Sequence, residues 1–400
     1  MSMHRPVRPC RTQPALRWLI SGLSLLGAQA ALAQSSVTLY GVADDGIAYV
    51  NNSQGASRTY MRAGNLATSK FGLLGTEDLG GGLKALFQLE AGFDLNTGAS
   101  STSGLLFNRQ AFVGLKSERA GALTLGRQYT PYYLFLGPYT GSNWLTGATA
   151  AHPGDIDGLD SSFRINNSVS YVTPTIAGVT ASAQYGVGGI PGSVERGQSI
   201  SAAVRYAAGP IGIAAGYLKM YNTELASGFD SASTASIPTS AVNAGYVSAR
   251  SIQHVAVAGN YTIGDLVLGL NYSNVRYAPG ARSLFTDTAI FNTYSGLAVY
   301  NFTPAFSMGA GYSYTLASKA NGISSAARYH QVSLKEAYNL SKRTTLYALQ
   351  AYTHTNGRTL GAKGSGQIID AAALAGDSQN STPSSTNNQV AVILGITVKF

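Results

Sequence analysis

The sequence predicts an all-β protein, a sixteen-stranded antiparallel transmembrane β-barrel with short turns at one rim and long loops at the other. Apolar and polar side chains alternate along much of the chain after residue 34, as they do in half-buried strands. Charged residues make up only 11% of the chain, against about 25% in soluble domains. Beyond the N-terminal region no apolar run reaches the roughly 20 residues that a membrane-spanning helix needs. A barrel whose strands alternate between lipid and lumen accounts for all three observations.

The first 33 residues have the composition of a secretory signal peptide. Four arginines and no acidic residue precede an apolar stretch that begins at Trp18. Ala31-Leu32-Ala33 then offers a small-x-small cleavage site. We therefore expect residues 1–33 to be removed on export and residues 34–400 to form the mature barrel.

Removal of this segment changes the charge and the cysteine content. Lys plus Arg falls from 27 to 23 against 18 acids, so the net charge drops from +9 to about +5. This smaller excess weakens a nucleic-acid-binding interpretation of the basic sequence. Cys10 is the only cysteine and lies in the predicted signal, so we expect neither disulfides nor thiol chemistry in the mature chain.

Turn signals between the alternating segments divide the mature chain into candidate strands. The last one is the clearest, with alternate residues from Val390 to Phe400 apolar on one face. Short and long connections alternate, which is typical of outer-membrane barrels with periplasmic turns and extracellular loops. An even strand number also places both termini on the periplasmic side. The sixteen candidates cover residues 37–50, 58–76, 81–94, 106–118, 121–129, 164–174, 177–186, 198–208, 211–222, 251–263, 265–276, 291–302, 306–317, 328–340, 344–355 and 389–400.

The lipid environment requires the sheet to close into a barrel. In hydrocarbon every backbone N–H and C=O needs a partner, so an open sheet edge cannot face lipid. Sixteen strands close a barrel wide enough for an aqueous lumen. A soluble β-helix or sandwich array would show a regular repeat or more surface charge, and the sequence shows neither.

Several segments resemble the general trimeric porins of Gram-negative bacteria, and most of all those of β-proteobacteria. They are SVTLYG at 36–41, FGLLGTEDLGGGLKA at 71–85, NRQAFVGL at 108–115, LTLGRQY at 123–129 and the terminal Phe400. The resemblance covers about residues 34–400. It implies a homotrimer of separate pores in the outer membrane, among phospholipid and lipopolysaccharide, assembled by the barrel-assembly machinery with Phe400 as a signal.

The resemblance also implies a pore constriction. In such porins the third extracellular loop, here residues 130–163, folds into the lumen. Its acidic residues, here Asp155, Asp157 and Asp160, would face basic residues on the opposite wall.

Three basic positions match the wall of this constriction by resemblance. Lys70 precedes Phe-Gly, Arg109 precedes Gln-Ala-Phe, and Arg164 opens the strand that leaves the third loop. The alternation of apolar and polar residues places Lys70 and Arg164 on the lumen face of their strands. Arg109 falls on the same face as apolar residues of its strand, so alternation does not assign it to the lumen. Glu90 falls on the face of its strand opposite to that of Phe87 and Leu89, so we expect it to face the lumen.

Other chemistries find little support. Asp155-x-Asp157-Gly158-x-Asp160 provides three carboxylates, fewer than the six to eight oxygens that calcium takes. The histidines are scattered, without metal-ligand spacing. No P-loop, GxSxG or dinucleotide-binding fingerprint is present. We therefore expect no enzyme activity, cofactor, metal or nucleic-acid partner. Tyrosines near strand ends are predicted to form an interfacial girdle, among them Tyr129, Tyr185, Tyr221 and Tyr261.

The predicted function is passive diffusion of ions and small hydrophilic solutes. The basic wall residues and the residual positive charge predict a mild anion preference, which the acidic residues of the third loop oppose. Two alternatives stay open: a substrate-specific channel with a saturable track, and a structural or adhesive surface protein that acts through its long loops.

Overall fold

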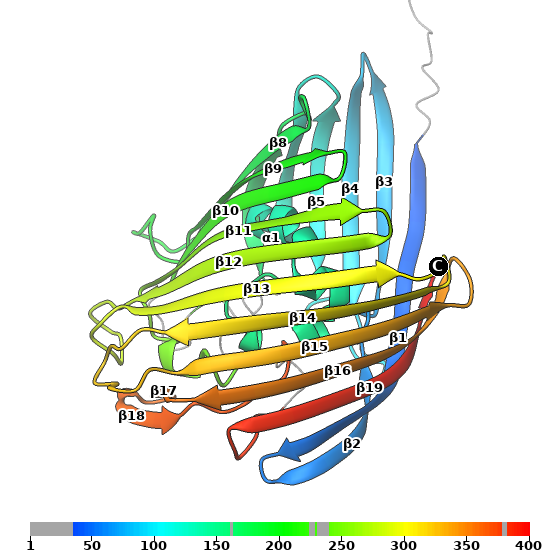
Figure 1. Ribbon diagram of the computed structural model, residues 1–400. Helices are drawn as coiled ribbons and strands as arrows, with labels where there is room; N and C mark the ends of the chain where they lie inside the picture. Colours follow the sequence, from blue (N-terminus) through cyan, green and yellow to red (C-terminus); the bar gives the residue numbers. More distant parts are fainter. Residues whose placement is uncertain (1–34, 161–162, 224–228, 230–239, 378–381) are drawn as a thin grey trace, which may run out of the picture.

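The protein is a closed sixteen-stranded antiparallel barrel, as the sequence predicts (Figure 1). The computed structural model describes residues 35–160, 163–223, 229, 240–377 and 382–400. The predicted signal peptide lies outside these residues and stays a prediction. None of the helices in the described ranges is long and apolar enough to cross a membrane.

The barrel strands follow one another in chain order, each paired with its predecessor, except that β2 and β3 are two parts of one barrel strand and both pair with β1. They are β1 (Ser36–Ser53), β2 (Ala56–Ala63), β3 (Lys70–Gly80), β4 (Leu83–Gly92), β5 (Gln110–Ser117), β6 (Gly121–Tyr129), β7 (Arg164–Val172), β8 (Val179–Gly186), β9 (Ser199–Ala208), β10 (Ile211–Tyr221), β11 (Ser251–Ile263), β12 (Leu266–Ala278), β13 (Ala289–Asn301), β14 (Phe306–Ala317), β15 (Arg328–Asn339), β16 (Thr344–Asn356) and β19 (Asn388–Lys399).

The last strand closes the barrel. β19 pairs with β16 on one side and with β1 on the other, in a register that sets Val42 opposite Lys399. Phe400 continues this ladder, because its backbone N–H and C=O both bond to Gly41, at 3.0 and 2.9 Å. The two chain ends of the barrel therefore meet at the rim with short turns. The role of Phe400 as an assembly signal stays a prediction.

The segment expected as one strand at 58–76 is interrupted. β2 and β3 both pair with β1, and residues 64–69 bulge between them. The fully buried Asp44 carboxylate accepts hydrogen bonds from the backbone N–H groups of Asn65, Leu66 and Ala67 at 2.6 to 3.2 Å. It also accepts one from the Tyr347 hydroxyl at 2.9 Å. The Asp44 carboxylate thus accepts hydrogen bonds from backbone N–H groups that have no partner in the sheet at this bulge.

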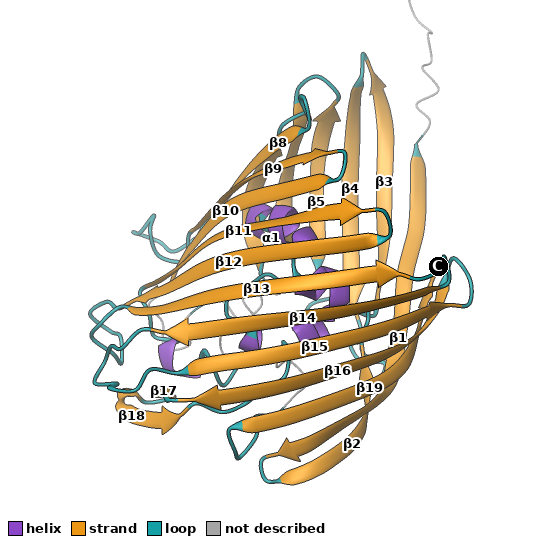
Figure 2. Cartoon of the chain, viewed as in Figure 1, coloured by secondary structure: helices purple, strands orange, loops and turns teal. Residues whose placement is uncertain are grey.

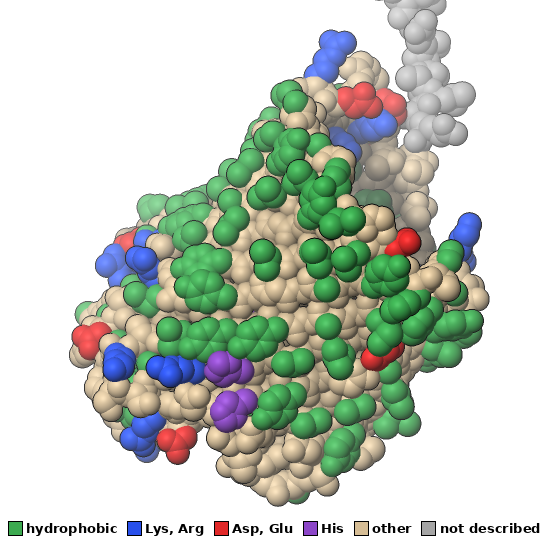
Figure 3. All heavy atoms as spheres, viewed as in Figure 1, with side chains coloured by type: hydrophobic (Ala, Val, Ile, Leu, Met, Phe, Trp, Pro, Cys, Tyr) green, Lys and Arg blue, Asp and Glu red, His purple; other side chains and the backbone are tan. Residues whose placement is uncertain are grey.

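Side chains alternate between the two faces of the wall. On β19, Leu394, Ile396 and Val398 are exposed on the outside, whereas Ala391 and Ile393 are buried inside. Apolar side chains cover much of the outer face (Figure 3). This is the expected pattern for a barrel that faces lipid.

The girdle prediction is wrong for Tyr129. Tyr185 and Tyr261 are exposed on the outer face, but Tyr129 is only 6% exposed and lies inside the barrel. The register of β6 against β7 shifts between Gly126 and Gln128. The extra residue of this β-bulge lies on β7, where three steps from Ser168 to Ile165 match two steps on β6. Beyond this irregularity of the ladder the Tyr129 side chain is buried inside the barrel.

The long connections form the rim opposite the short turns (Figure 1). The last long connection, expected as a loop at 356–388, contains a small two-stranded sheet of β17 (Arg358–Gly361) and β18 (Gly364–Asp370). After β18 its described residues turn into the barrel, where Ala373, Leu374 and Ala375 are buried.

Candidate functional site

The loop after β6 lies inside the barrel as short helical turns (Figure 2). Thr130 caps the first helix, because its side chain accepts a hydrogen bond from the Tyr133 N–H and Pro131 follows it. Within the described residues the turns are α1 (Pro131–Leu136), η2 (Gly137–Tyr139), η3 (Ser142–Thr146), α2 (Gly147–Ala150) and η4 (Pro153–Asp155).

Apolar contacts hold α1 against the inner wall. Tyr132 and Leu136 are fully buried against β9 and β10. A Cβ at Gly216 would collide with Leu136, so the missing side chain lets the helix approach the strand. The Tyr132 N–H also donates a hydrogen bond to the Ser201 hydroxyl oxygen at 3.1 Å. The start of the loop is thus fixed by close packing rather than by charge.

The far end of the loop is bound to the opposite part of the wall. Gln331 on β15 donates a hydrogen bond to the carbonyl of Ala151 at 2.7 Å. Lys335, on the same strand, donates to the carbonyl of Trp144. Inward-facing polar residues of β15 therefore act as hydrogen-bond partners for backbone carbonyls in and next to the short helical turns of the loop.

Two of the three predicted acidic residues serve the packing of this loop. Asp157 is fully buried, and its carboxylate contacts His152 Nδ1 and the Ser273 hydroxyl, each at 2.6 Å. Asp155, also fully buried, accepts a hydrogen bond from the Asp160 N–H at 3.0 Å. Ser273 belongs to β12, so Asp157 connects the loop to the wall.

The ion pair between His152 and Asp157 shifts both pKa values. Burial alone lowers the pKa of His152, but the Asp157 carboxylate more than offsets it and raises that pKa above its ordinary value. Burial alone raises the pKa of Asp157, and the His152 imidazolium lowers it below its ordinary value. The pair is therefore fully ionised between the ordinary values of 3.8 for Asp and 6.5 for His.

We expect the attachment of the loop to weaken above this pH window. The stabilisation from His152 is complete below pH 6.5 and is lost as pH rises through the raised pKa. The stabilisation from Asp157 is present above 3.8 and is lost as pH falls through its lowered pKa. Open-channel current noise in planar bilayers should rise from pH 6 to pH 9. His152→Gln should be noisy at every pH, and equal noise in both proteins at pH 6 would contradict the prediction.

Asp160 is the third predicted acid, and it faces a different set of groups. Burial and then the Asp155 and Asp377 carboxylates raise its pKa well above the ordinary value, while Arg62 and Arg109 oppose this shift. Its carboxylate lies against Gly147, where a Cβ would collide with it. Asp160 is therefore the predicted loop acid that shares a field with the basic wall.

A buried carboxylate joins two of the predicted basic residues. Glu90 on β4 pairs with Lys70 Nζ at 3.2 Å and with Arg109 Nε at 2.9 Å. The Tyr40 hydroxyl donates a third hydrogen bond to Glu90 at 2.9 Å. Glu90 is only 2% exposed. Its single charge offsets only part of the two cations beside it.

Arg164 joins this group through an aromatic ring. Its guanidinium lies 4.9 Å from the Tyr129 ring centroid and donates a hydrogen bond to the Tyr129 hydroxyl at 3.1 Å. Arg109 lies 5.8 Å from the same ring. The inward-facing Tyr129 ring therefore lies between the second and third predicted basic residues and contacts both.

A further ion pair inside the barrel involves the last long loop. Arg62 on β2 pairs with Asp377 at 3.2 Å, and their side chains are 2% and 13% exposed. Asp377 also reaches the third loop, since its backbone N–H bonds to the Gly147 carbonyl at 3.1 Å. The Gly154 N–H bonds to the Gly376 carbonyl in the same way. Two loops therefore pack on each other inside the barrel.

A family model described as Gram-negative porin matches residues 21–358. The chain belongs to the Gram-negative porin family. This membership also places it in the outer membrane, and the closed sixteen-stranded barrel agrees with that assignment.

Named relatives of this porin share the family description. It is 41% identical to outer membrane porin protein 32 of Delftia acidovorans over 42% of this chain and 48% of that protein. It is 35% identical to an outer membrane porin protein of Bordetella pertussis over 50% of this chain and 58% of that protein. These two alignments thus span about half the length of each relative.

Solved structures share its fold. An anion-selective porin from Comamonas acidovorans is 26% identical and superposes with a TM-score of 0.66, over 92% of this chain and all of that one. OmpT of Vibrio cholerae, at 18% identity and a TM-score of 0.60, shares the fold over 94% of this chain and all of that one. The relatives are channels rather than enzymes.

Sequence reasoning missed two parts of the porin's inner charge network. Asp377 and Arg62 belong to no motif that the sequence analysis used. Their ion pair could not be predicted, because the loop that holds Asp377 reaches β2 only in the folded barrel. Arg127 is buried and donates to the carbonyl of Asn108, the residue before Arg109, at 2.6 and 2.9 Å. Its place in a matched motif was the only signal that pointed to it. Within the described ranges, no three His, Cys, Asp or Glu side chains gather as metal ligands.

Proposed function

We propose that the porin is a water-filled channel for passive diffusion of ions and small hydrophilic solutes, with a mild preference for anions. The observation that carries the proposal is the grouping of Lys70, Arg109 and Arg164 around Glu90 and Tyr129 inside the barrel. A charged group in a narrow, low-dielectric lumen acts on passing ions more strongly than the same group at an open surface.

The balance of charge supports anions over cations. Arg62, Lys70, Arg109 and Arg164 contribute four positive charges to this network. Glu90 and Asp377 oppose them with two negative charges, and the raised pKa of Asp160 reduces its share. We propose Asp160 and Asp377 as the acidic side of the constriction, in place of Asp155 and Asp157. The latter two have partners within the packed loop.

A homotrimer of separate pores is part of the same proposal. It is supported by membership of the porin family. The anion-selective porin with the same fold supports the ion preference.

Single-channel recording of the purified mature porin in a planar bilayer, under a salt gradient, tests the proposal. We expect ohmic openings in groups of three and a reversal potential of the sign for anions. A folded, inserted barrel without conductance would refute the channel, and a reversal potential at zero or of the opposite sign would refute the anion preference. Saturation of the current by one solute would indicate a substrate-specific channel instead.

A further inference from the structure

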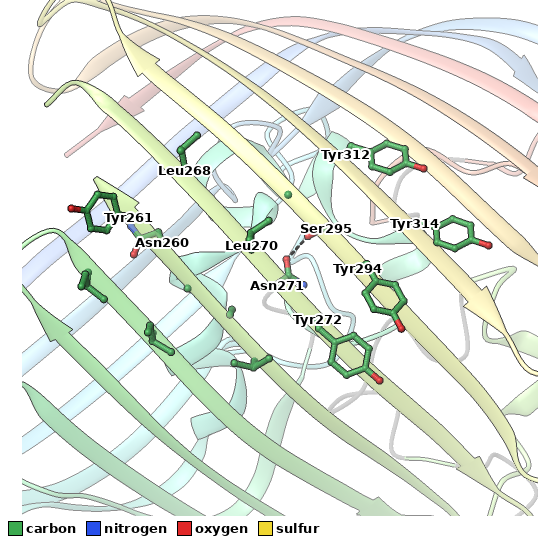
Figure 4. Close-up of a pocket in the computed structure, with 16 residues that line it drawn as sticks. Asn260, Tyr261, Leu268, Leu270, Asn271, Tyr272, Tyr294, Ser295, Tyr312 and Tyr314 are labelled. Atoms are coloured by element: carbon green, nitrogen blue, oxygen red, sulfur yellow. Dashed lines mark hydrogen bonds between the residues drawn. The ribbon is translucent and has the colours of Figure 1, made fainter. Parts of the chain in front are cut away.

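The outer face of the porin carries a row of aromatic, imidazole and amide side chains near the loop-bearing rim. In an antiparallel sheet directly opposed residues point to the same face, so the strand register defines rows that run around the barrel. This row crosses β12 to β16 and then β19, and Figure 4 shows its three tyrosines in line on the first three strands. Its members, each opposite the next, are Tyr272, Tyr294, Tyr314, His330, His354 and Asn388.

Two histidines are direct neighbours in this row. His330 on β15 lies opposite His354 on β16, and their ring centroids are 6.2 Å apart. Both side chains are half-buried, on the same outward face as the exposed Val332 and Tyr352, which form the next outward pair of the two strands. Figure 3 shows histidine side chains adjoining each other on the outer face. The strand register thus brings together two imidazoles that the sequence keeps apart.

Hydrogen bonds to Asn388 determine which nitrogen of His354 carries the proton. The Asn388 amide nitrogen donates to the Asn387 side-chain oxygen at 2.7 Å, so the Asn388 side-chain oxygen is the atom that lies 2.8 Å from His354 Nδ1. The same oxygen accepts a hydrogen bond from the Tyr352 hydroxyl at 2.7 Å. Because an amide oxygen only accepts, Nδ1 of His354 carries the proton and Nε2 keeps its lone pair. Histidines that bind metals are held in the same way, by a partner at the nitrogen that does not bind the metal.

His330 is oriented by two tyrosines. Its Nδ1 lies 2.8 Å from the Tyr312 hydroxyl, and its ring centroid lies 4.7 Å from that of Tyr314. The hydroxyl oxygen accepts a hydrogen bond from a protonated Nδ1, which leaves the lone pair on Nε2 of His330 as well. Neither Nε2 atom has a hydrogen-bond partner within the described part of the chain. Both imidazoles therefore offer a free nitrogen at the surface.

The spacing of the two rings suits a single metal ion. A metal ion bound about 2 Å from an imidazole nitrogen lies about 3 Å from the centre of that ring. Two rings whose centroids are 6.2 Å apart therefore span one ion when their nitrogens lie on opposite sides of it. Two nitrogens with water in the remaining positions form the tetragonal ligand set of Cu²⁺, the divalent ion that nitrogen sites bind most tightly. Calcium and magnesium take oxygen ligands instead.

We propose that His330 and His354 bind one Cu²⁺-type transition metal ion through their Nε2 atoms on the outer face of the barrel, with Asn388 and Tyr312 as positioning residues. The sequence shows no metal-ligand spacing for this pair, because the two histidines meet only through the register of β15 and β16. The site needs the folded barrel and is independent of the ion selectivity of the pore. Conductance therefore serves as a separate check that a variant is folded and inserted.

Calorimetric titration of the mature porin with Cu²⁺, in detergent micelles and without an affinity tag, tests the site. We expect one Cu²⁺ per chain, with electron paramagnetic resonance showing coupling to two imidazole nitrogens. N388L should weaken binding roughly ten-fold, since loss of the partner that orients a metal-binding histidine typically costs that much or more. H330A and H354A each remove a ligand and should weaken it further, and H330A/H354A should lose the site. Excess Mg²⁺ should not compete.

Matched variants separate a paired site from the mere number of histidines. H354A/Y314H places a new imidazole opposite His330 on its other side and should regain most of the binding that H354A loses. H354A/L346H returns the imidazole to an exposed position of β16, but opposite Tyr338, and should bind as weakly as H354A.

Three results would overturn the proposal. The first is unchanged Cu²⁺ binding in H330A/H354A with conductance like that of the parent, which would assign the ion to other groups. The second is equal recovery in H354A/L346H and H354A/Y314H, since the register would then have no role. The third is a parent that binds no Cu²⁺.

Discussion

Asp377→Asn is expected to make the porin discriminate more strongly in favour of anions. Asp377 neutralises Arg62 at 3.2 Å in a nearly buried pair, and it adds a negative field at Asp160. Removing its charge leaves the Arg62 guanidinium uncompensated in the lumen, where low-dielectric walls strengthen its field. We expect the anion-to-cation permeability ratio, measured from the reversal potential in a salt gradient, to rise roughly two-fold or more.

Removal of the positive partner of this ion pair should shift the permeability ratio in the opposite direction. Arg62→Gln should lower the anion preference, and the double variant should return close to the parent because the two charges cancel. Asp370→Asn is the matched control, since Asp370 lies on the same loop in an exposed pair with Arg358. An equal shift in Asp370→Asn would show that the charge of the loop as a whole, and not the Arg62–Asp377 pair, determines selectivity.

Asp44→Ala is expected to destabilise the barrel by about 3 kcal/mol or more, because several donors lose one buried acceptor together. Three backbone N–H groups of the bulge at 64–69 and the Tyr347 hydroxyl all donate to the Asp44 carboxylate. Alanine offers none of these bonds, and the site is fully buried. Urea unfolding of the refolded porin in detergent micelles measures the difference in free energy of unfolding.

Asp45→Ala is the control for this change. Asp45 is adjacent in sequence but half-buried, and its carboxylate bonds to the Gly46 N–H at 2.9 Å. We expect it to cost less than about 1 kcal/mol, as for an ordinary partly exposed hydrogen bond. If both variants unfold at the same urea concentration, the Asp44 carboxylate does not stabilise the interrupted strand.

The barrel architecture was predictable because its cause is local. Alternation along β19 assigns each side chain to lipid or lumen, and this pattern repeats because every strand meets the same two environments. The interruption at 64–69 was not predictable, because it depends on Asp44, some twenty residues earlier in the chain. The inward position of Tyr129, next to a β-bulge between β6 and β7, was likewise not predictable.

The inner charge network was predictable only in part. Lys70, Glu90 and Arg109 lie on or next to neighbouring strands, and their side chains are in contact, but their role at a constriction stays a prediction. Asp155 and Asp157 were expected beside them, yet their partners are Asp160, His152 and Ser273. A loop sequence does not reveal which of its carboxylates will cap its own backbone, since that depends on how the loop packs against the wall.

By itself, the sequence determined the fold class, the approximate strands and the family. These follow from periodicity and local motifs, which need no knowledge of distant contacts. Only the tertiary structure decided the contacts between distant segments: Arg62 with Asp377, two loops packed on each other, and the row from Tyr272 to Asn388. Strand register and loop packing create these contacts, because both depend on interactions that form once the barrel closes.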